Sequence, residues 1–115
     1  DGQTGHPDHI CASQWTTAAF AKVAPAGATL HYSTHTAGWL DAFRARLDEL
    51  NVFMGAEPPC TPESEMSINE QLSGPVLDQK LDAIRSMTSQ VEPLIQALGE
   101  DYFRKGMKEE AFRPA

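Results

Sequence analysis

Residues 5–9, with the sequence GHPDH, hold two of the chain's four histidines around a proline and an aspartate. His6 and His9 are three residues apart, so at the start of a helix their side chains can point to the same side. The positive end of the helix dipole disfavours imidazolium, and neutral imidazole is the form that binds a metal. His9 is therefore a candidate zinc ligand.

Asp8 and His6 complete the candidate site. Asp8 could accept a hydrogen bond from a neighbouring imidazole and fix its tautomer, as carboxylates around metal sites do. His6 would then act as an acid or as an electrostatic group on a substrate. The spacing alone favours a plainer interpretation, in which the histidines only cap a helix. A catalytic zinc usually has three protein ligands, and no other cluster in the sequence completes such a set.

The remaining polar candidates have ordinary explanations. His31 and His35 follow a strand pattern at period-two offsets, where solvated or hydrogen-bonded imidazoles are the rule. Cys11 and Cys60 are 49 residues apart with no CxxC pair, so we interpret them as buried or incidental thiols, compatible with a reducing cytoplasm. The sequence has no P-loop, no GxGxxG and no serine in a nucleophile elbow.

Length and charge limit the possible functions. The 115 residues suffice for one modest domain, and 41% of them are hydrophobic. Sixteen acidic against nine basic residues give a net charge of −7, which argues against a nucleic-acid partner. No apolar run approaches the eighteen or so residues of a membrane span. The chain begins with Asp1 and no signal sequence follows, so we expect it to be part of a longer protein.

The residues before the chain's midpoint predict two helices and a strand. A well-buried helix is expected from Pro7 to about Val23, because Pro7 and Asp8 suit a first helical turn. A short strand is expected in the run ATLHYS, residues 28–33. Thr36 then fits as the cap of a second helix, whose apolar stripe is Leu40, Phe43, Leu47 and Leu50.

The second half is expected to begin with a surface loop at residues 55–64, rich in proline. Alternation at residues 66–69 predicts a half-buried strand, and Ser73, Gly74 and Pro75 open a third helix. Pro93 should end or kink this helix, residues 94–98 should add a short helical piece, and Gly99 should stop it. The third helix has the stripe Leu77, Leu81, Ile84, Met87 and Val91, and the tail 100–115 has the anchors Tyr102, Phe103 and Phe112.

These elements predict a helix-rich α/β chain with two or three short strands. So small a sheet could not bury both of its faces, so the pattern indicates part of an α/β layer whose other strands are absent.

The stretch TGHPDH running into a helix resembles a metal motif of the LmbE-like, or PIG-L, family of zinc-dependent N-acetylglucosaminyl deacetylases. Lys80, Ala83, Ser89 and Gln90 resemble a second family segment, K-x-x-A-x-x-x-H-x-S-Q, although Met87 stands where that segment has histidine. The resemblance covers nearly the whole chain as the C-terminal half of such an enzyme. It implies the C-terminal part of a Rossmann-like three-layer α/β/α sandwich.

The same resemblance implies roles for the three candidate residues. His9 would be a zinc ligand, His6 would stabilise the transition state or protonate the leaving amine, and Asp8 would tune His6. The family's other ligands and its general base lie in an N-terminal AHPDD-type motif that these 115 residues lack. We therefore expect an inactive part of a cytoplasmic enzyme acting on amino-sugar conjugates. Its partners would be the enzyme's N-terminal half and, in a homo-oligomer, other copies.

Two alternatives stay open. The chain could be a non-enzymatic structural or binding domain in which GHPDH only caps a helix. It could also be a complete α/β hydrolase-like module that uses His6 and Asp8 without metal, although it lacks a nucleophile.

Overall fold

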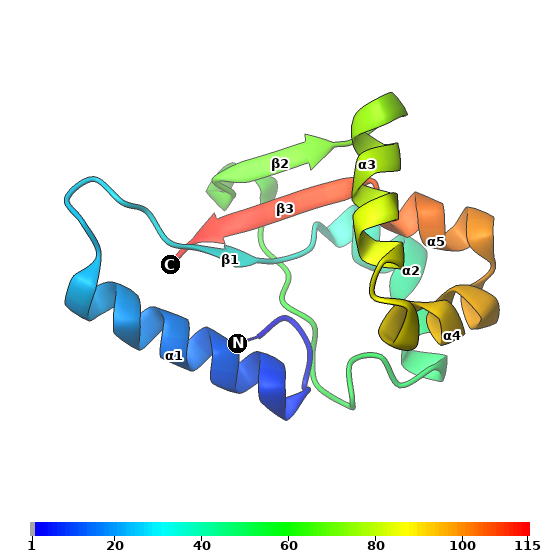
Figure 1. Ribbon diagram of the computed structural model, residues 1–115, viewed down its shortest axis with the longest axis horizontal. Coiled ribbons are helices and arrows are strands. Elements are labelled where there is room, and N and C mark those ends of the chain that lie inside the picture. Colours follow the sequence, from blue (N-terminus) through cyan, green and yellow to red (C-terminus); the bar gives the residue numbers. More distant parts are fainter. Residues whose placement is uncertain (1) are drawn as a thin grey trace. The chain divides into compact units, whose positions relative to one another are not determined.

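A computed structural model describes residues 2–115 as a mixed α/β chain (Figure 1). The predicted helix-rich α/β class with short strands is confirmed. The helices are α1 (Pro7–Val23), α2 (Ala37–Glu49), α3 (Gly74–Arg85), α4 (Thr88–Leu98), α5 (Glu100–Gly106) and the 3₁₀ helix η1 (Glu63–Glu65). The strands are β1 (His31–Ser33), β2 (Ile68–Gln71) and β3 (Glu109–Pro114).

Internal contacts divide the described part of the chain into two units. Unit 1 comprises residues 2–69 and 111–115, and unit 2 comprises residues 70–110. The assignment of residues 1–115 to a single domain stays a prediction. Across residues 2–115, none of the helices has the length and apolarity that a membrane crossing requires.

The strands form a sheet in the order β1-β3-β2. β1 and β3 run antiparallel, whereas a Rossmann-like sandwich is built on parallel strands, so that arrangement is not confirmed. The aligned pairs are His31 with Pro114, Tyr32 with Arg113, and Ser33 with Phe112.

The first three predicted elements are observed. Pro7 occupies the first turn of α1, and the Thr36 hydroxyl caps α2 by accepting a hydrogen bond from the Trp39 N–H at 3.0 Å. The expectation that the first helix is well buried is wrong, because none of its residues is buried. Trp15 is 74% exposed and Val23 is 77% exposed. Only one side of α1 meets the rest of unit 1, so apolar residues on its other side face solvent.

The buried centre of unit 1 is partly polar. Leu47 and Phe53 are buried, and so are Thr34, His35, Thr36 and Thr61. The hydroxyls of Thr34 and Thr61 are 2.8 Å apart, so each of these buried groups has a partner. Backbone hydrogen bonds join His35 to Pro59 and to Thr61, which ties the predicted surface loop to the end of β1.

The strand predicted at residues 66–69 lies two residues later, at β2, and all four of its residues are exposed. The prediction of a half-buried strand is therefore wrong. The backbone N–H of Ser67 donates to Phe112 O at 2.8 Å, and that of Leu72 donates to Lys108 O at 2.7 Å. Backbone pairing beside β3, rather than burial of alternate side chains, fixes this strand.

Unit 2 packs α3, α4 and α5 around the buried side chains of Leu77, Leu81, Val91 and Phe103. The predicted single stripe from Leu77 to Val91 is wrong, because α3 ends at Arg85 and Met87 is 53% exposed. α4 then continues through Pro93, which neither ends it nor separates residues 94–98. Gly99 ends α4 as predicted, with a φ of +84° that favours glycine.

The tail, for which the sequence predicts only anchor residues, contains helix α5 and strand β3. Of the predicted anchors, Phe103 is buried in α5, and Tyr102 and Phe112 are half-buried. The last residues form β3, which lies between the other two strands of the sheet. Pairing on both sides supplies the strand with partners that the local sequence does not reveal.

Candidate functional site

His6 is the N-cap of α1. Its Nδ1 accepts a hydrogen bond from the backbone N–H of Asp8 at 3.1 Å. An N–H can only donate, so Nδ1 carries a lone pair here, and neutral His6 has its proton on Nε2. The structure therefore contains the helix cap that the plainer interpretation of GHPDH predicts.

The Asp8 side chain does not make the expected hydrogen bond to His6. The distance from Asp8 Oδ2 to His6 Nδ1 is 3.9 Å, and the carboxylate side chain is 88% exposed. Nδ1 already accepts from the Asp8 backbone and has no proton to offer the carboxylate. The catalytic role of Asp8 stays a prediction.

His9 is oriented by a residue that the sequence did not single out. Thr4 Oγ1 lies 2.8 Å from His9 Nδ1, and the same hydroxyl oxygen accepts from the His6 backbone N–H at 3.3 Å. The hydroxyl thus engages the Nδ1 nitrogen of His9. The rings of His6 and His9 lie 5.2 Å apart, near one another as their spacing predicts. The sequence contains a signal for this contact, because a threonine two residues before a helix cap can form hydrogen bonds with nearby groups.

Gly5 holds this segment against the turn after α2. Its N–H donates to Phe53 O at 3.2 Å. A Cβ on Gly5 would lie 2.8 Å from Phe53 O and 2.9 Å from Ala56 Cβ, which is closer than real contacts allow. Glycine at this position therefore lets the chain approach the turn and fixes where α1 begins.

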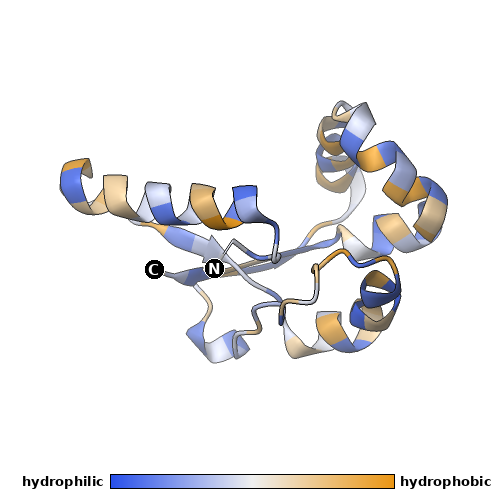
Figure 2. Cartoon of the chain, turned by 90° about the horizontal axis from the view of Figure 1, so that it is seen from below, coloured by the Kyte–Doolittle hydropathy of each residue, from blue (hydrophilic) through white to orange (hydrophobic). Residues whose placement is uncertain are grey.

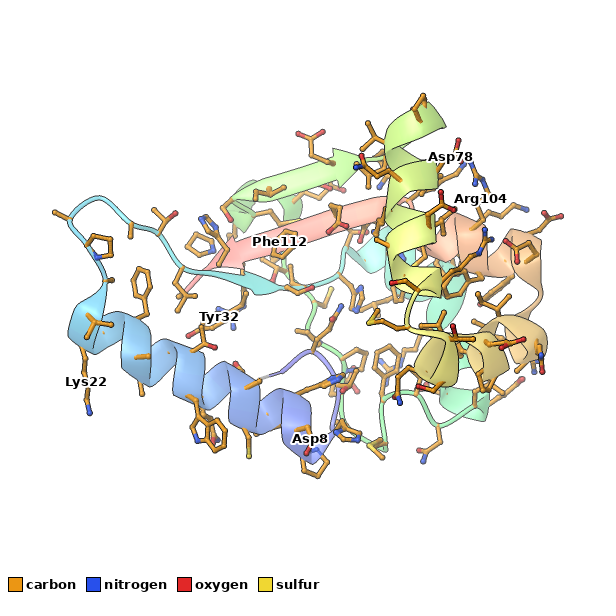
Figure 3. All side chains as sticks on the ribbon, viewed as in Figure 1. Asp8, Lys22, Tyr32, Asp78, Arg104 and Phe112 are labelled. Atoms are coloured by element: carbon orange, nitrogen blue, oxygen red, sulfur yellow. The ribbon has the colours of Figure 1, made fainter. Side chains whose placement is uncertain are left out.

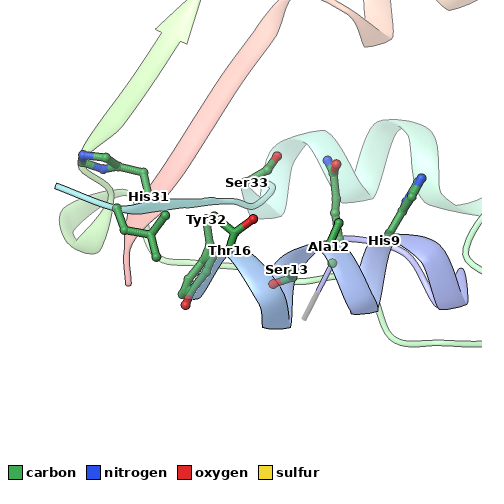
Figure 4. A pocket seen from close by; sticks show the side chains of 10 residues that line it. His9, Ala12, Ser13, Thr16, His31, Tyr32 and Ser33 are labelled. Carbon is green, nitrogen blue, oxygen red and sulfur yellow. The ribbon is translucent and has the colours of Figure 1, made fainter. Parts of the chain in front are cut away.

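A groove of about 350 Å³ runs between α1 and β1 within unit 1, and His9 lies on its wall (Figure 4). Tyr32 OH, on the β1 side, is 2.6 Å from Thr17 Oγ1 on α1. His6 and Asp8 do not line the groove. The α1 side contributes residues at helical spacing from His9, a pattern that the sequence alone contains. The lining residues are Gly2, Gln3, His9, Ala12, Ser13, Thr16, Leu30, His31, Tyr32 and Ser33.

The other histidines are hydrogen-bonded, as predicted. His31 Nδ1 lies 2.6 Å from Ser67 Oγ, and its Nε2 lies 2.9 Å from Thr29 Oγ1. His35 is buried, its Nε2 lies 3.3 Å from Gln3 Nε2, and its ring stacks on Trp39 with the centroids 4.0 Å apart. Both imidazoles therefore have structural roles in unit 1.

The two thiols differ from expectation. Cys11 and Cys60 are both exposed, so the alternative of buried thiols is wrong. Cys11 lies on α1, which buries none of its residues, and this explains its exposure.

The second segment that carries the family resemblance lies in unit 2. Lys80 Nζ donates to Met107 O at 2.7 Å and pairs with Glu110 Oε1 at 2.7 Å, so its ammonium joins α3 to the start of β3. Ala83 is on α3, and Ser89 and Gln90 are on α4. Their side chains are exposed. This segment has a clear structural role through Lys80.

Residues 2–115 contain no group of three or more His, Cys, Asp or Glu side chains placed to hold a metal ion. The residues present therefore do not fit a zinc site by themselves, and His9 is at most one ligand. We expect the 115-residue chain to bind zinc weakly, because one ligand leaves the ion mostly hydrated. Titration calorimetry checks this expectation. A stoichiometric site of nanomolar affinity would contradict it and would point first to His31 and His35.

Comparison of the chain with protein-family models, with curated proteins and with solved structures finds no match.

Proposed function

We propose that the chain is part of a zinc-dependent amide hydrolase that removes the N-acetyl group from N-acetylglucosamine conjugates in the cytoplasm. The resemblance of TGHPDH to the deacetylase motif suggests this reaction. The observation that supports it is the placement of His9, whose Nδ1 is held by Thr4 at 2.8 Å while its ring lies on the wall of a 350 Å³ groove. Engagement of one ring nitrogen by a neighbouring group is the usual arrangement of a histidine that ligates a metal through the other.

The proposal requires residues from outside this chain. The remaining zinc ligands and the general base would come from an AHPDD-type motif in an N-terminal half of the same enzyme. In the complete enzyme the present chain would be the C-terminal part of a Rossmann-like three-layer sandwich, with further strands supplied by that half. When bound, zinc would supply an activated water and polarise the acetyl carbonyl.

His6 would donate a hydrogen bond to the oxyanion. Its Nδ1 accepts from the Asp8 backbone at 3.1 Å, so the neutral ring carries its proton on Nε2 and offers it as a donor. An imidazolium would carry protons on both nitrogens and would lose the helix cap. The cap therefore favours electrostatic stabilisation by neutral His6 over protonation of the leaving amine. Asp8 would act on the field around His6 and not through a hydrogen bond to it.

The groove beside His9 fits a hydroxylated ligand. Ser13, Thr16, Tyr32 and Ser33 line it together with backbone and apolar groups. Hydroxyls both donate and accept, so they can pair with the hydroxyls of a sugar.

Acetate release tests the proposal directly. We expect a polypeptide containing both the AHPDD-type motif and this chain to carry zinc and release acetate from N-acetylglucosamine conjugates, and the 115-residue chain alone to release none. The N-terminal half alone is the matched control, because it lacks His9 and His6. If the complete polypeptide holds zinc but releases no acetate from any N-acetylated amino sugar, the proposed reaction is wrong.

The second candidate is a structural or binding domain in which GHPDH has no chemical task. The hydrogen bond from the Asp8 N–H to His6 Nδ1 favours it, because capping alone accounts for His6. Capping does not account for the contact between Thr4 and His9.

A further inference from the structure

We propose that two copies of this chain associate through the outer face of α1, as an antiparallel pair of helices with Trp15 at its centre. The proposal does not depend on the deacetylase reaction. The outer face comprises exposed residues on the side of α1 away from β1: Asp8, Cys11, Trp15, Ala18, Ala19 and Lys22.

The exposure pattern defines this face. α1 has 17 residues and buries none of them, but four are half-buried and mark the side that meets the rest of unit 1: Ile10, Ser13, Thr17 and Phe20. Thr17 bonds there to Tyr32. At 100° per residue, Trp15 points to the opposite side, and its side chain is 74% exposed. Hydrophobic and hydrophilic residues alternate along the length of α1 (Figure 2). An exposed tryptophan among small apolar residues is a typical interface centre.

The charges on α1 indicate that a second copy of this chain covers the outer face. α1 contains one acidic residue and one basic residue, Asp8 near its start and Lys22 near its end. Figure 3 shows them at opposite ends of the helix. They are 14 residues apart, almost four turns, so they lie on the same face and about 21 Å from one another. In an antiparallel pair, Asp8 lies opposite Lys22 of the partner subunit, and the helix dipoles also oppose each other favourably.

The spacing also matches a two-fold axis. Trp15 is the middle residue of α1, Asp8 and Lys22 are each seven residues from it, and Cys11 and Ala19 are each four residues from it. A two-fold axis at Trp15 therefore pairs both charges at once. It also sets Cys11 against Ala19 of the partner subunit. The small side chains of Cys11, Ala18 and Ala19 allow the helix axes to approach closely.

A dimer of this kind should be weak. A single pair of helices about 25 Å long buries less surface than a stable interface, so we expect a dissociation constant in roughly the micromolar range. Sedimentation equilibrium of the 115-residue chain checks this. Trp15→Ala should weaken the dimer at least about tenfold, because both central side chains are lost. Val76→Ala, at a 58% exposed apolar residue of α3, is the matched control and should leave it unchanged.

Charge reversal tests the antiparallel direction without disturbing Trp15. Lys22→Glu should weaken the dimer by setting two acidic groups together at each end, and Asp8→Lys combined with Lys22→Glu should restore much of the affinity. Circular dichroism checks that each variant keeps its helices. If the double variant associates no better than Lys22→Glu alone, the direction is wrong.

Disulfide formation tests the register. In a Cys60→Ser background, Ala19→Cys should give a disulfide-linked dimer under mild oxidation, because position 19 faces Cys11 of the partner subunit. Gln14→Cys, at an exposed position of α1 that does not belong to the outer face, is the control and should give little disulfide-linked dimer. If the Cys60→Ser chain without a cysteine at position 19 readily forms a disulfide between the Cys11 residues of two copies, the helices are parallel and the proposal is overturned. A chain that stays monomeric at millimolar concentration, or association that Trp15→Ala does not weaken, would also overturn it.

Discussion

Replacing His9 by alanine in the proposed complete enzyme is expected to remove bound zinc and acetate release together. His9, the ligand that the family resemblance implies, lies on the groove wall, and the ligands that remain could not hold the ion at low free zinc. Metal analysis of the purified variant beside a rate assay measures both losses. Thr4→Val should have a milder effect, lowering the affinity for zinc by roughly 10- to 100-fold, because it removes the group that orients the His9 ring.

His31→Ala is the matched control for this experiment. His31 also lines the groove, but both of its ring nitrogens already lie within hydrogen-bond distance of side-chain oxygens, of Ser67 and Thr29. The variant should keep its zinc. If His9→Ala retains a full equivalent of zinc, His9 is not a ligand.

Replacing His6 by alanine is expected to lower kcat by roughly 10² to 10⁴ while zinc content and KM stay close to their original values. The Nε2–H of neutral His6 would act only on the charge that develops in the transition state, so its loss should not affect ground-state binding. The same substitution also removes the α1 cap, which costs about 1 kcal/mol of stability. Rates under saturating substrate, together with thermal melts, separate the two effects.

His6→Ser distinguishes catalysis from capping. A serine hydroxyl can accept the hydrogen bond from the Asp8 N–H, so this variant should regain the stability lost in His6→Ala without regaining activity. Restored activity together with restored stability would mean that His6 is a helix cap and nothing more. If His6→Ala loses its zinc and His9→Ala keeps it, His6 is the zinc ligand and His9 is not.

The local elements of unit 1 were predictable because their signals are local. Pro7 at the first turn of α1 and Thr36 as the cap of α2 act through backbone groups one to three residues away. The nearness of the His6 and His9 rings likewise follows from helical spacing. What His6 bonds to was not predictable, because Nδ1 can accept from a backbone N–H or donate to the Asp8 carboxylate. The observed geometry selects the backbone.

Elements that depend on distant partners were mispredicted. A period-two pattern suggested a half-buried strand at residues 66–69, yet β2 begins at Ile68 and all of its residues are exposed. β3 was not predicted, because its residues become a strand by pairing on both sides. The stripe from Leu77 to Val91 looked like one helix, and it divides between α3 and α4 because the backbone leaves the helical region at Met87, with φ −89° and ψ 56°.

The sequence by itself determined the α/β class, the starts of α1 and α2, the end of α4 and the spacing of the histidines, because each depends on neighbours within about one helical turn. The tertiary structure decided which residues meet over longer distances. It placed Tyr32 against Thr17, brought Gly5 to the turn at Phe53, and left the outer face of α1 exposed. A periodic pattern shows that a helix has an apolar side, but burial also requires a surface to cover that side, and only the assembled chain decides whether there is one.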